Sequence, residues 1–364
     1  MSSTSHTESG ATQQVTLPPE PLRAFTAGVL EAVGTPPDIA DEVSRHLVGA
    51  NLAGHDSHGV QRLPWYVESA LRGTLDVQAR PEIVEQRQAC ALFDANRGFG
   101  HYAAKVAINW ALDHAPDYGL ASAAIRRSGH IGRLGEYSET AVARGFLAIV
   151  TVGNAGPSAR WTPPFGGQAH FLGTNPWSLG APAGPRPYVY DAATTTVAEG
   201  KVQLARARGA ELKPDCVIDK EGRPTSNPED LYDGGSMVPL GAQVAGHKGF
   251  GLGLGSALFG ALSQAAARPQ DGEQSDLGGV WMLAVDPSAF GDPGVYRARA
   301  EHNLAALKGV PPAPGFSEVL VPGEPEAQSR RQRSAGIPIP AATFNALSEL
   351  ADRFDVPGPA PQER

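Results

Sequence analysis

Residues 100–125 read GHYAAKVAINWALDHAPDYGLASAAI and pair a helix with a strand. The first sixteen of them space their apolar side chains as a helix does, and LASAAI, residues 120–125, is an apolar run of strand length. The next segment repeats this order, because GEYSETAVARG, residues 135–145, has helical spacing and FLAIVTV, residues 146–152, reads as a strand. The alternation indicates an α/β architecture.

Working outward, the chain divides into a helical N-terminal segment, an α/β region and two tails. Residues 17–80 show helical spacing and carry the motif SHG. We expect them to pack against a C-terminal part, residues 310–356, with the nucleotide-binding and substrate region between them over residues 81–309. Residues 1–16 are polar and small, which predicts a disordered tail, and residues 357–364 predict a loose one.

The composition narrows the functional classes. Of 364 residues, 41% are hydrophobic and 19% are charged, as in an ordinary globular protein. The net charge of −8 and the absence of a long Lys/Arg run argue against nucleic-acid binding, and no apolar run approaches the length of a membrane span. Only Cys90 and Cys216 occur, and the chain start lacks an apolar signal segment, so we expect a cytoplasmic protein.

Residues 51–66, NLAGHDSHGVQRLPWY, gather ionisable side chains at the end of a helix. The pKa of a histidine lies near working pH, so His58 could move a proton, and Arg62, one turn along, could clamp a carboxylate with two hydrogen bonds. Helix capping by Asp56 or Ser57 is an alternative explanation. It leaves Arg62 unexplained.

Two other chemistries are open for the same stretch. His55 and His58 have the spacing of a pair of metal ligands, but Gly59 follows at once and no cysteine is near, so we expect no metal. Ser57, His58 and a distant carboxylate such as Asp191 could form the triad of a serine hydrolase. Ser57 does not lie in the G-x-S-x-G motif that such a nucleophile often occupies.

Three further clusters combine turns with polar residues. In SGHIGRLGEYSETA, residues 128–141, His130 follows a strand, and a loop leads into a helix whose free N–H groups, reinforced by Arg133, suit a phosphate. The turn GTNP, residues 173–176, could offer backbone donors. Asp191 ends a strand and could orient a histidine.

A dinucleotide motif, Gly98-x-Gly100-x-x-Ala103, stands between a strand and a helix, as a Rossmann fingerprint requires. The strand that follows ends in Arg126 and Arg127, where an acidic residue for the ribose is usual. The connection before the glycines is also longer than the usual tight turn. We therefore interpret the glycines as a turn, and the Rossmann alternative would make the two arginines determinants for NADP.

Taken in order, the motifs resemble one known family. DSHGVQRLPWY, SGHIGRLGEYS, PFGGQAHFLGTNPWSLGAP, DAATTTVAEGK, GHKGFGLGLG and VPGE follow one another over residues 20–353 as in the malate/L-lactate dehydrogenase-like family of NAD(P)-dependent oxidoreductases. That family has ureidoglycolate dehydrogenase, sulfolactate dehydrogenase and Δ1-piperideine-2-carboxylate reductase branches. The resemblance implies an α/β fold whose nucleotide-binding domain is not a Rossmann fold.

The resemblance also implies roles for the clustered residues. His58 would be the catalytic acid/base, in a relay with Ser57 and Asp191, and Arg62 would hold the substrate carboxylate. His130 would line the pocket, and in some members it takes the proton role instead. The residues implied to contact NAD or NADP are His130, Gly132, Arg133, Leu134, Gly173, Thr174, Asn175, Pro176, Lys201, Gly323 and Glu324.

The implied reaction is hydride transfer between a nicotinamide cofactor and a small 2-oxo or 2-hydroxy acid. The alternative is NADPH-dependent reduction of a cyclic imine carboxylate. Arg160, Trp161 and Trp177 depart from the family pattern near the expected pocket and leave the substrate open. The resemblance implies a homodimer, and residues 247–267 predict a helix apolar on nearly every side, which must be buried all round.

Overall fold

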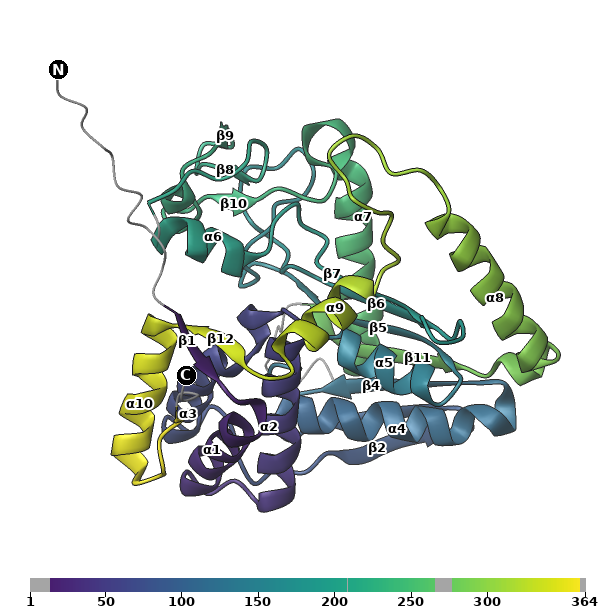
Figure 1. Ribbon diagram of the computed structural model, residues 1–364, viewed down its shortest axis with the longest axis horizontal. Coiled ribbons are helices and arrows are strands. Elements are labelled where there is room, and N and C mark those ends of the chain that lie inside the picture. The colour runs from purple at the N-terminus through teal and green to yellow at the C-terminus, as the bar shows by residue number, and fades with distance from the viewer. Residues whose placement is uncertain (1–13, 208, 266–276, 361–364) are drawn as a thin grey trace.

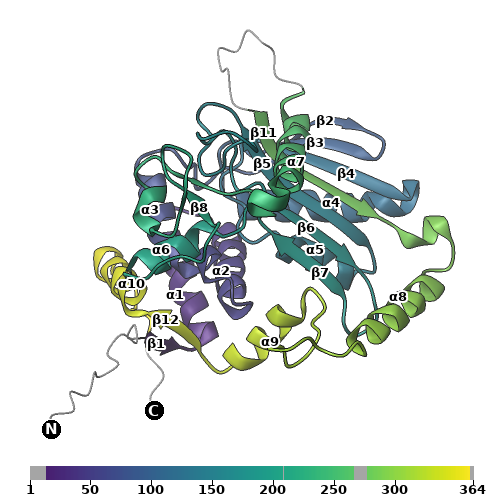
Figure 2. The same ribbon diagram turned by 90° about the horizontal axis from the view of Figure 1, so that it is seen from above.

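The structure, a computed structural model, describes residues 14–207, 209–265 and 277–360. At its centre is a seven-stranded sheet with the order β2-β3-β4-β11-β5-β6-β7 (Figure 1 and Figure 2). The strands are β2 (Glu82–Arg87), β3 (Cys90–Asp94), β4 (Leu120–Arg126), β5 (Leu147–Ala155), β6 (Trp177–Ala181), β7 (Tyr188–Ala192) and β11 (Leu277–Val285). Only β3 and β4 run parallel, and every other neighbouring pair in this sheet is antiparallel. A Rossmann domain needs a mostly parallel sheet, so the prediction of a non-Rossmann α/β fold is confirmed.

Helices cover both faces of the sheet. On one face lie α4 (Gly100–Tyr118) and α5 (Gly135–Ala143), and on the other lie α7 (Ala242–Gly260) and the 3-10 turn η4 (Ala261–Gln264). Strand β5 shows the alternation that produces this arrangement. Ala148 and Val150 are buried against α4 and α5, whereas the hydroxyl of Thr151 on the opposite face donates to Ser256 of α7 at 2.7 Å.

A second core joins the two ends of the chain. It contains α1 (Pro19–Ala32), α2 (Pro37–Leu52), α3 (Leu63–Leu71) and α10 (Ala341–Phe354). The strand β1 (Gln14–Leu17) pairs antiparallel with β12 (Ile337–Pro340) beside these helices. The predicted tail over residues 1–16 is therefore wrong for residues 14–16, which the antiparallel ladder orders. Residues 1–13 and 361–364 lie outside the described residues.

The rest of the chain forms small elements around the sheet. Helix α6 (Glu199–Ala207) packs near a three-stranded sheet of β10 (Ser236–Met237), β8 (Val217–Ile218) and β9 (Pro224–Thr225). Four 3-10 turns are η1 (Asp56–His58), η2 (Val60–Arg62), η3 (Pro228–Leu231) and η5 (Pro287–Phe290). Helix α8 (Pro293–Lys308) buries none of its residues and lies at the edge of the molecule (Figure 2), while α9 (Glu324–Arg333) returns to α2.

The glycine motif before α4 has a packing role. A β-carbon on Gly100 would overlap the backbone of Gly129, so glycine is needed where these two segments cross. The two arginines that the Rossmann alternative assigned to NADP instead bind a carboxylate: Arg126 and Arg127 both donate to Asp94 at 2.8 Å. These two ion pairs therefore link the ends of β3 and β4.

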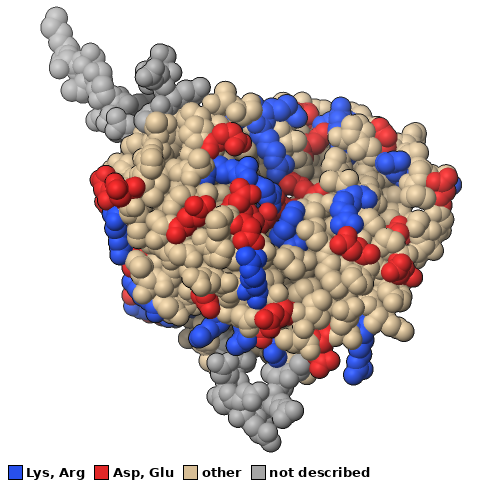
Figure 3. Space-filling model, turned by 90° about the horizontal axis from the view of Figure 1, so that it is seen from below, with Lys and Arg blue, Asp and Glu red and all other residues tan. Residues whose placement is uncertain are grey.

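Within one chain the apolar helix is not buried all round. Leu252 and Leu258 of α7 and Leu262 of η4 are each about half exposed in the single chain. None of the described helices combines the length and apolar character needed to cross a membrane. On the face drawn in Figure 3, basic and acidic side chains are interspersed rather than gathered by sign.

Candidate active site

The predicted catalytic residues of the SHG motif lie together just after α2. The hydroxyl of Ser57 is 3.0 Å from Nδ1 of His58, and Nε of Arg62 donates to the carbonyl oxygen of Ser57 at 2.7 Å. The ring of His58 stacks on that of His130, with centroids 5.5 Å apart and planes inclined by 18°. Two segments separated in sequence therefore bring two imidazoles and one guanidinium to one corner of the fold.

The electrostatics of this corner favour a neutral His58. Burial of the ring and the nearby positive charge of Arg62 lower the pKa of His58 to about 4. At neutral pH the ring then has a free nitrogen lone pair that can accept a proton. A group of this kind suits general-base catalysis, and an anion bound to Arg62 would raise the pKa of His58 again.

Buried hydrogen bonds fix the backbone of the SHG segment. The side-chain oxygen of Asn51 accepts from the Val60 N–H at 2.9 Å, and its amide nitrogen donates to Asp56 at 2.7 Å. A β-carbon on Gly59 would overlap the Asn51 side chain. Neither Asp56 nor Ser57 caps a helix, so the capping alternative is wrong.

Helix α9 holds the same segment from the C-terminal part of the chain. Arg333 donates to Oδ1 of Asp56 at 2.7 Å and to the carbonyl oxygen of Asn51 at 2.6 Å. His55 lies 3.1 Å from a carboxylate oxygen of Glu326. These contacts make α9 a brace for the turn that carries His58.

Asp191 is close to this corner but has another partner. Its Oδ2 accepts the N–H of Gly135 at 2.7 Å, and burial raises the pKa of its carboxyl group. Within the described residues, no hydrogen bond joins Asp191 to Ser57 or His58. The structure therefore brings Ser57 and His58 together but does not hydrogen-bond Asp191 to either of them, and a serine-hydrolase triad would lack its acid for the same reason.

The loop from His130 to Leu134 packs closely against buried rings of the core. Gly132 has φ +71°, and a β-carbon there would overlap the rings of His46 and His101. The N–H of Arg133 donates to Nε2 of His46 at 2.9 Å. Because the N–H groups of Arg133 and Gly135 are both occupied, the predicted set of free N–H donors is wrong at these two positions.

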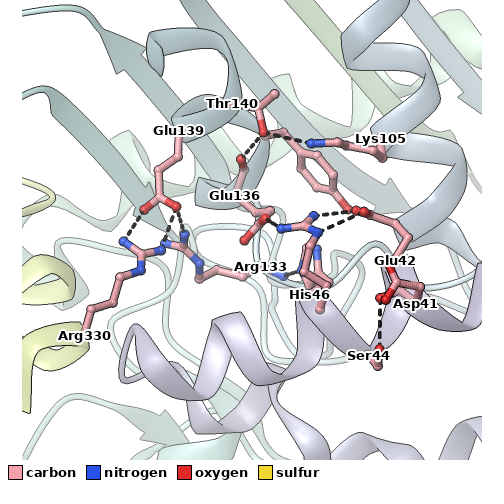
Figure 4. A network of polar contacts seen from close by, with 12 residues as sticks. Asp41, Glu42, Ser44, His46, Lys105, Arg133, Glu136, Glu139, Thr140 and Arg330 are labelled. Carbon is pink, nitrogen blue, oxygen red and sulfur yellow. Dashed lines mark hydrogen bonds and ion pairs between the residues drawn. The ribbon is translucent and has the colours of Figure 1, made fainter. Parts of the chain in front are cut away.

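The side chain of Arg133 is almost completely buried and only partly satisfied. Its Nη2 binds Glu139 at 2.5 Å, and Arg330 of α9 binds the same carboxylate at 2.7 Å (Figure 4). The Nε and Nη1 atoms of Arg133 have no hydrogen-bond partner among the residues that the structure describes. Buried unpaired guanidinium nitrogens suit an anion such as a phosphate, so this position fits a dinucleotide.

A cavity of about 590 Å³ opens on the other side of Glu139 and Arg330. Gly323 and Glu324, both predicted to contact the dinucleotide, line it together with Arg186 and Arg331. Glu324 accepts from Lys308 at 2.6 Å and from the N–H of Val321 at 2.9 Å. The cavity is thus large, lined in part by charged side chains, and connected to the His130 loop through the Arg133–Glu139–Arg330 chain.

The remaining predicted cofactor residues have different settings. Asn175 is buried, and its amide nitrogen donates to Gly253 of α7 at 2.7 Å and to Asn154 at 3.0 Å, so this side chain holds elements of the fold together. The neighbours Gly173, Thr174 and Pro176 bond to backbone or hydroxyl groups in the same way. Lys201 is exposed near the start of α6, beside Gly200, where a β-carbon would come 2.8 Å from Cβ of Ser57.

Three residues of this corner were missed from the sequence. His46 and His101 are completely buried, and Tyr66 places its hydroxyl between His101 and His130. A signal was present for His46, because it lies on the apolar face of α2 with Ile39 and Val43. Tyr66 looked like one of a pair of apolar aromatic residues.

The chain is similar to known proteins over almost its whole length. The family model for malate/L-lactate dehydrogenase matches residues 17–348. Hydroxycarboxylate dehydrogenase B of Escherichia coli strain K12 is 33% identical over 345 residues, which are 92% of this chain and 93% of that protein.

The chain belongs to the malate/L-lactate dehydrogenase family.

Solved structures agree with this. Malate dehydrogenase from Entamoeba histolytica matches with a TM-score of 0.89 and 25% identity, over 96% of this chain and all of that one. Δ1-Piperideine-2-carboxylate reductase from Pseudomonas syringae pvar. tomato matches with a TM-score of 0.79 and 30% identity, over 92% and 99% of the two chains. The family prediction is confirmed, and the chain is a dehydrogenase of this family. No group of three or more potential metal-binding side chains occurs within the described ranges.

Proposed function

We propose that this dehydrogenase transfers a hydride between a nicotinamide dinucleotide, NAD or NADP, and C2 of a small 2-hydroxy or 2-oxo acid. The observation that carries the proposal is the stacking of the His58 ring on the His130 ring, with Arg62 four residues after His58 on the next 3-10 turn. Relatives named as malate and hydroxycarboxylate dehydrogenases support this substrate class.

Arg62 would bind the carboxylate of the substrate. Only its Nε is used, in the bond to Ser57, and its terminal nitrogens have no hydrogen-bond partner in the part of the chain that the structure covers. A guanidinium presented in this way can bind a carboxylate with two parallel hydrogen bonds. Such a clamp fixes the orientation of C2, and positioning of this kind contributes several kcal/mol to catalysis.

His58 would move the proton. During oxidation of a hydroxy acid, its neutral ring accepts the hydroxyl proton, and during reduction the protonated ring returns it. Ser57, 3.0 Å from Nδ1, keeps the ring oriented. When bound, the dinucleotide supplies the hydride chemistry.

The dinucleotide would lie along residues that the sequence motifs selected. Arg133 offers unpaired buried nitrogens next to the Gly132–Leu134 loop, and the cavity beside Gly323 and Glu324 has room for a nucleotide. Lys201 stands near Ser57 through its neighbour Gly200. These residues, with His130 and the Gly173–Pro176 turn, are the proposed contacts.

We also propose a cytoplasmic homodimer. Four apolar side chains of α7 and η4 are between 44% and 52% exposed in one chain, namely Leu252, Leu258, Phe259 and Leu262. An apolar surface of this kind is typical of a permanent interface. Trp65, 51% exposed beside the catalytic corner, would let a second copy close the site from outside. Both cysteines are free, as expected in a reducing compartment.

A substrate screen tests the activity. Oxidation of NADH and NADPH is followed with a panel of 2-oxo acids and cyclic imine carboxylates, and the reverse reaction with 2-hydroxy acids. We expect turnover with at least one 2-oxo acid and binding of one dinucleotide, seen as a change in its fluorescence. Turnover only with cyclic imines would change the assigned substrate from a 2-oxo acid to a cyclic imine carboxylate. Labelling of Ser57 by a fluorophosphonate without any dinucleotide binding would contradict the proposal.

A further inference from the structure

Next to His58 the structure contains three more histidines, of which His46 and His101 are completely buried and His130 is partly exposed. The ring centroids of His46 and His101 are 4.7 Å apart, those of His101 and His130 are 5.9 Å apart, and those of His130 and His58 are 5.5 Å apart. The proposed reaction needs only one proton-moving imidazole. The other rings therefore call for an explanation of their own.

The hydroxyl of Tyr66 connects two of these rings. It lies 2.8 Å from Nδ1 of His130 and 3.3 Å from Nε2 of His101, and the tyrosine is only 3% exposed. Burial raises the pKa of Tyr66, so the phenol keeps its proton, and burial lowers the pKa of both histidines well below the usual value, so each ring is neutral. A phenol has one proton and can donate to only one of the two nitrogens. The other ring must then donate to the phenol oxygen.

Of the two possible arrangements, one leaves a buried donor unpaired. If Tyr66 donated to His101, the proton of that neutral ring would sit on Nδ1, an atom that is buried without any partner among the residues described. If Tyr66 donates to His130, the proton of His101 sits on Nε2 and points to the phenol, and Nδ1 of His101 carries only a lone pair. Buried N–H groups without an acceptor are rare in proteins, and neutral His46 already has one, because its Nε2 accepts from Arg133 and its Nδ1 has no partner among the residues described. The arrangement in which Tyr66 donates to His130 avoids a second one.

We propose that Tyr66 and His101 are positioning residues that hold His130 as the neutral tautomer with its proton on Nε2. His130 then donates a hydrogen bond from Nε2 toward the C2 oxygen of the substrate, while His58 alone moves the proton. This assignment rests on the proposed function for the identity of the substrate, although the tautomer itself does not.

A neutral His130 also leaves His58 able to accept the substrate proton. The groups that face the His130 ring are His58, His101, Tyr66, Trp65 and Arg62. A second proton on His130 would add a cation next to Arg62 and beside the ring that has to accept the substrate proton. The donated bond from Tyr66 occupies Nδ1 and opposes that second protonation.

Histidine-selective ¹⁵N NMR of the intact wild-type protein reads the tautomer directly. Loss of one resonance set in His130→Gln assigns the ring. We expect a protonated Nε2 and an unprotonated Nδ1 for His130 at pH 7. A proton found on Nδ1 would overturn the proposal, whether or not any substrate is turned over.

Kinetics of two variants test the consequence. Tyr66→Phe removes only the hydroxyl, and we expect kcat to fall about tenfold, the size of one hydrogen bond, with the KM of the dinucleotide unchanged. The acid limb of the pH profile should move about one unit upward, because His130 can then take a second proton. A superimposable pH profile and an unchanged His130 NMR signal in Tyr66→Phe would reject the role of the hydroxyl.

His101 supplies a matched pair that separates positioning from packing. His101→Gln keeps an N–H that can donate to the Tyr66 oxygen, whereas His101→Leu has none. We expect the Gln variant to stay within about threefold of wild type and the Leu variant to reproduce the shift of Tyr66→Phe. Equal behaviour of the two variants would overturn the part assigned to His101. If the wild type binds no dinucleotide, the proposed function fails, while the NMR result still decides the tautomer.

Discussion

The corner around His58 and the outer side of the sheet, formed by α7 and α8, differ in how many of their side chains are held by contacts within one chain. In the corner, the rings of His58 and His130 stack, Asn51 and Arg333 hold the loop, and Tyr66 joins two rings. On the outer side, α8 buries none of its residues, and Leu252 and Leu258 of α7 are each about half exposed.

The difference assigns separate tasks to the two regions. The chemistry of the corner depends on contacts made within one chain, so changes there should alter turnover. The outer side presents apolar area, and burial of apolar area drives association without directing a reaction. Changes there should alter assembly and leave the chemical step almost untouched.

The largest effect is expected at His58. His58→Ala removes the group that accepts the substrate proton, and we expect kcat to fall about a thousandfold while dinucleotide binding changes little. Steady-state kinetics and dinucleotide fluorescence measure the two quantities. His302→Ala, at an exposed position on α8, is the control. If His58→Ala kept near-normal turnover and His130→Ala abolished it, the proton role would belong to His130.

A smaller effect is expected at Arg62. Arg62→Lys retains the charge but loses the planar fork, so the KM of carboxylate substrates should rise about 10- to 100-fold. The KM of the dinucleotide should change less. Arg72→Lys, on an exposed side chain at the end of α3, is the matched control. Equal losses for substrate and dinucleotide would make Arg62 a structural residue through its bond to Ser57.

The sequence predicted what is local and missed what is distant. Alternating helix and strand patterns indicated the α/β class, and the SHG segment joined Ser57, His58 and Arg62 within six residues. Strand β11 lies between β4 and β5, although more than one hundred residues separate it from either, and no local pattern predicts that order. The bond from Arg333 to Asp56 spans 277 positions and was missed for the same reason.

The sequence could not predict which group a side chain would hydrogen-bond when a backbone N–H was also within reach. Asp191 was expected to orient a histidine, but the N–H of Gly135 takes its carboxylate. The periodicity of α7 indicated complete burial, and only a second chain could provide it. Periodicity shows that a face is apolar and does not show which chain covers it.

The corner should also control the stability of the protein in acid. His46 and His101 are completely buried, and burial lowers their pKa well below 6.5. Below pH 6.5 the unfolded chain takes up protons that the folded chain does not, so the free energy of unfolding should fall as the pH drops and should level off above about pH 7. Each of these histidines adds a slope of at most about 1.4 kcal/mol per pH unit. The raised pKa of Asp191 works in the opposite direction and offsets part of this loss at the acid end.

Denaturant unfolding at pH 5.5, 6.5 and 7.5 measures that slope. We expect His101→Gln to reduce it, because one buried neutral ring is gone. His302→Gln, which removes an exposed histidine, should leave the slope as in the wild type. A wild-type stability that is flat from pH 7.5 to 5.5 would mean that the buried rings already carry protons.

The smallest effect on catalysis is expected on the outer side, at Leu258 of α7, which is 52% exposed. Leu258→Gln replaces apolar by polar surface, and if two copies pair through this face the loss counts once for each copy. Burial of a leucine is worth about 1.5–3 kcal/mol in full, so a half-covered pair should weaken the dimer at least about tenfold. Turnover at protein concentrations that keep the dimer intact should change less than about twofold, since the ring contacts of His58 and His130 are made within one chain and do not involve Leu258. Light scattering and activity measured over the same dilution series test both statements, with Leu120→Gln, 41% exposed at the start of β4, as control. If the wild-type protein were an active monomer, the active site would not need a second copy of the chain, and the exposed leucines of α7 would have to contact a different partner.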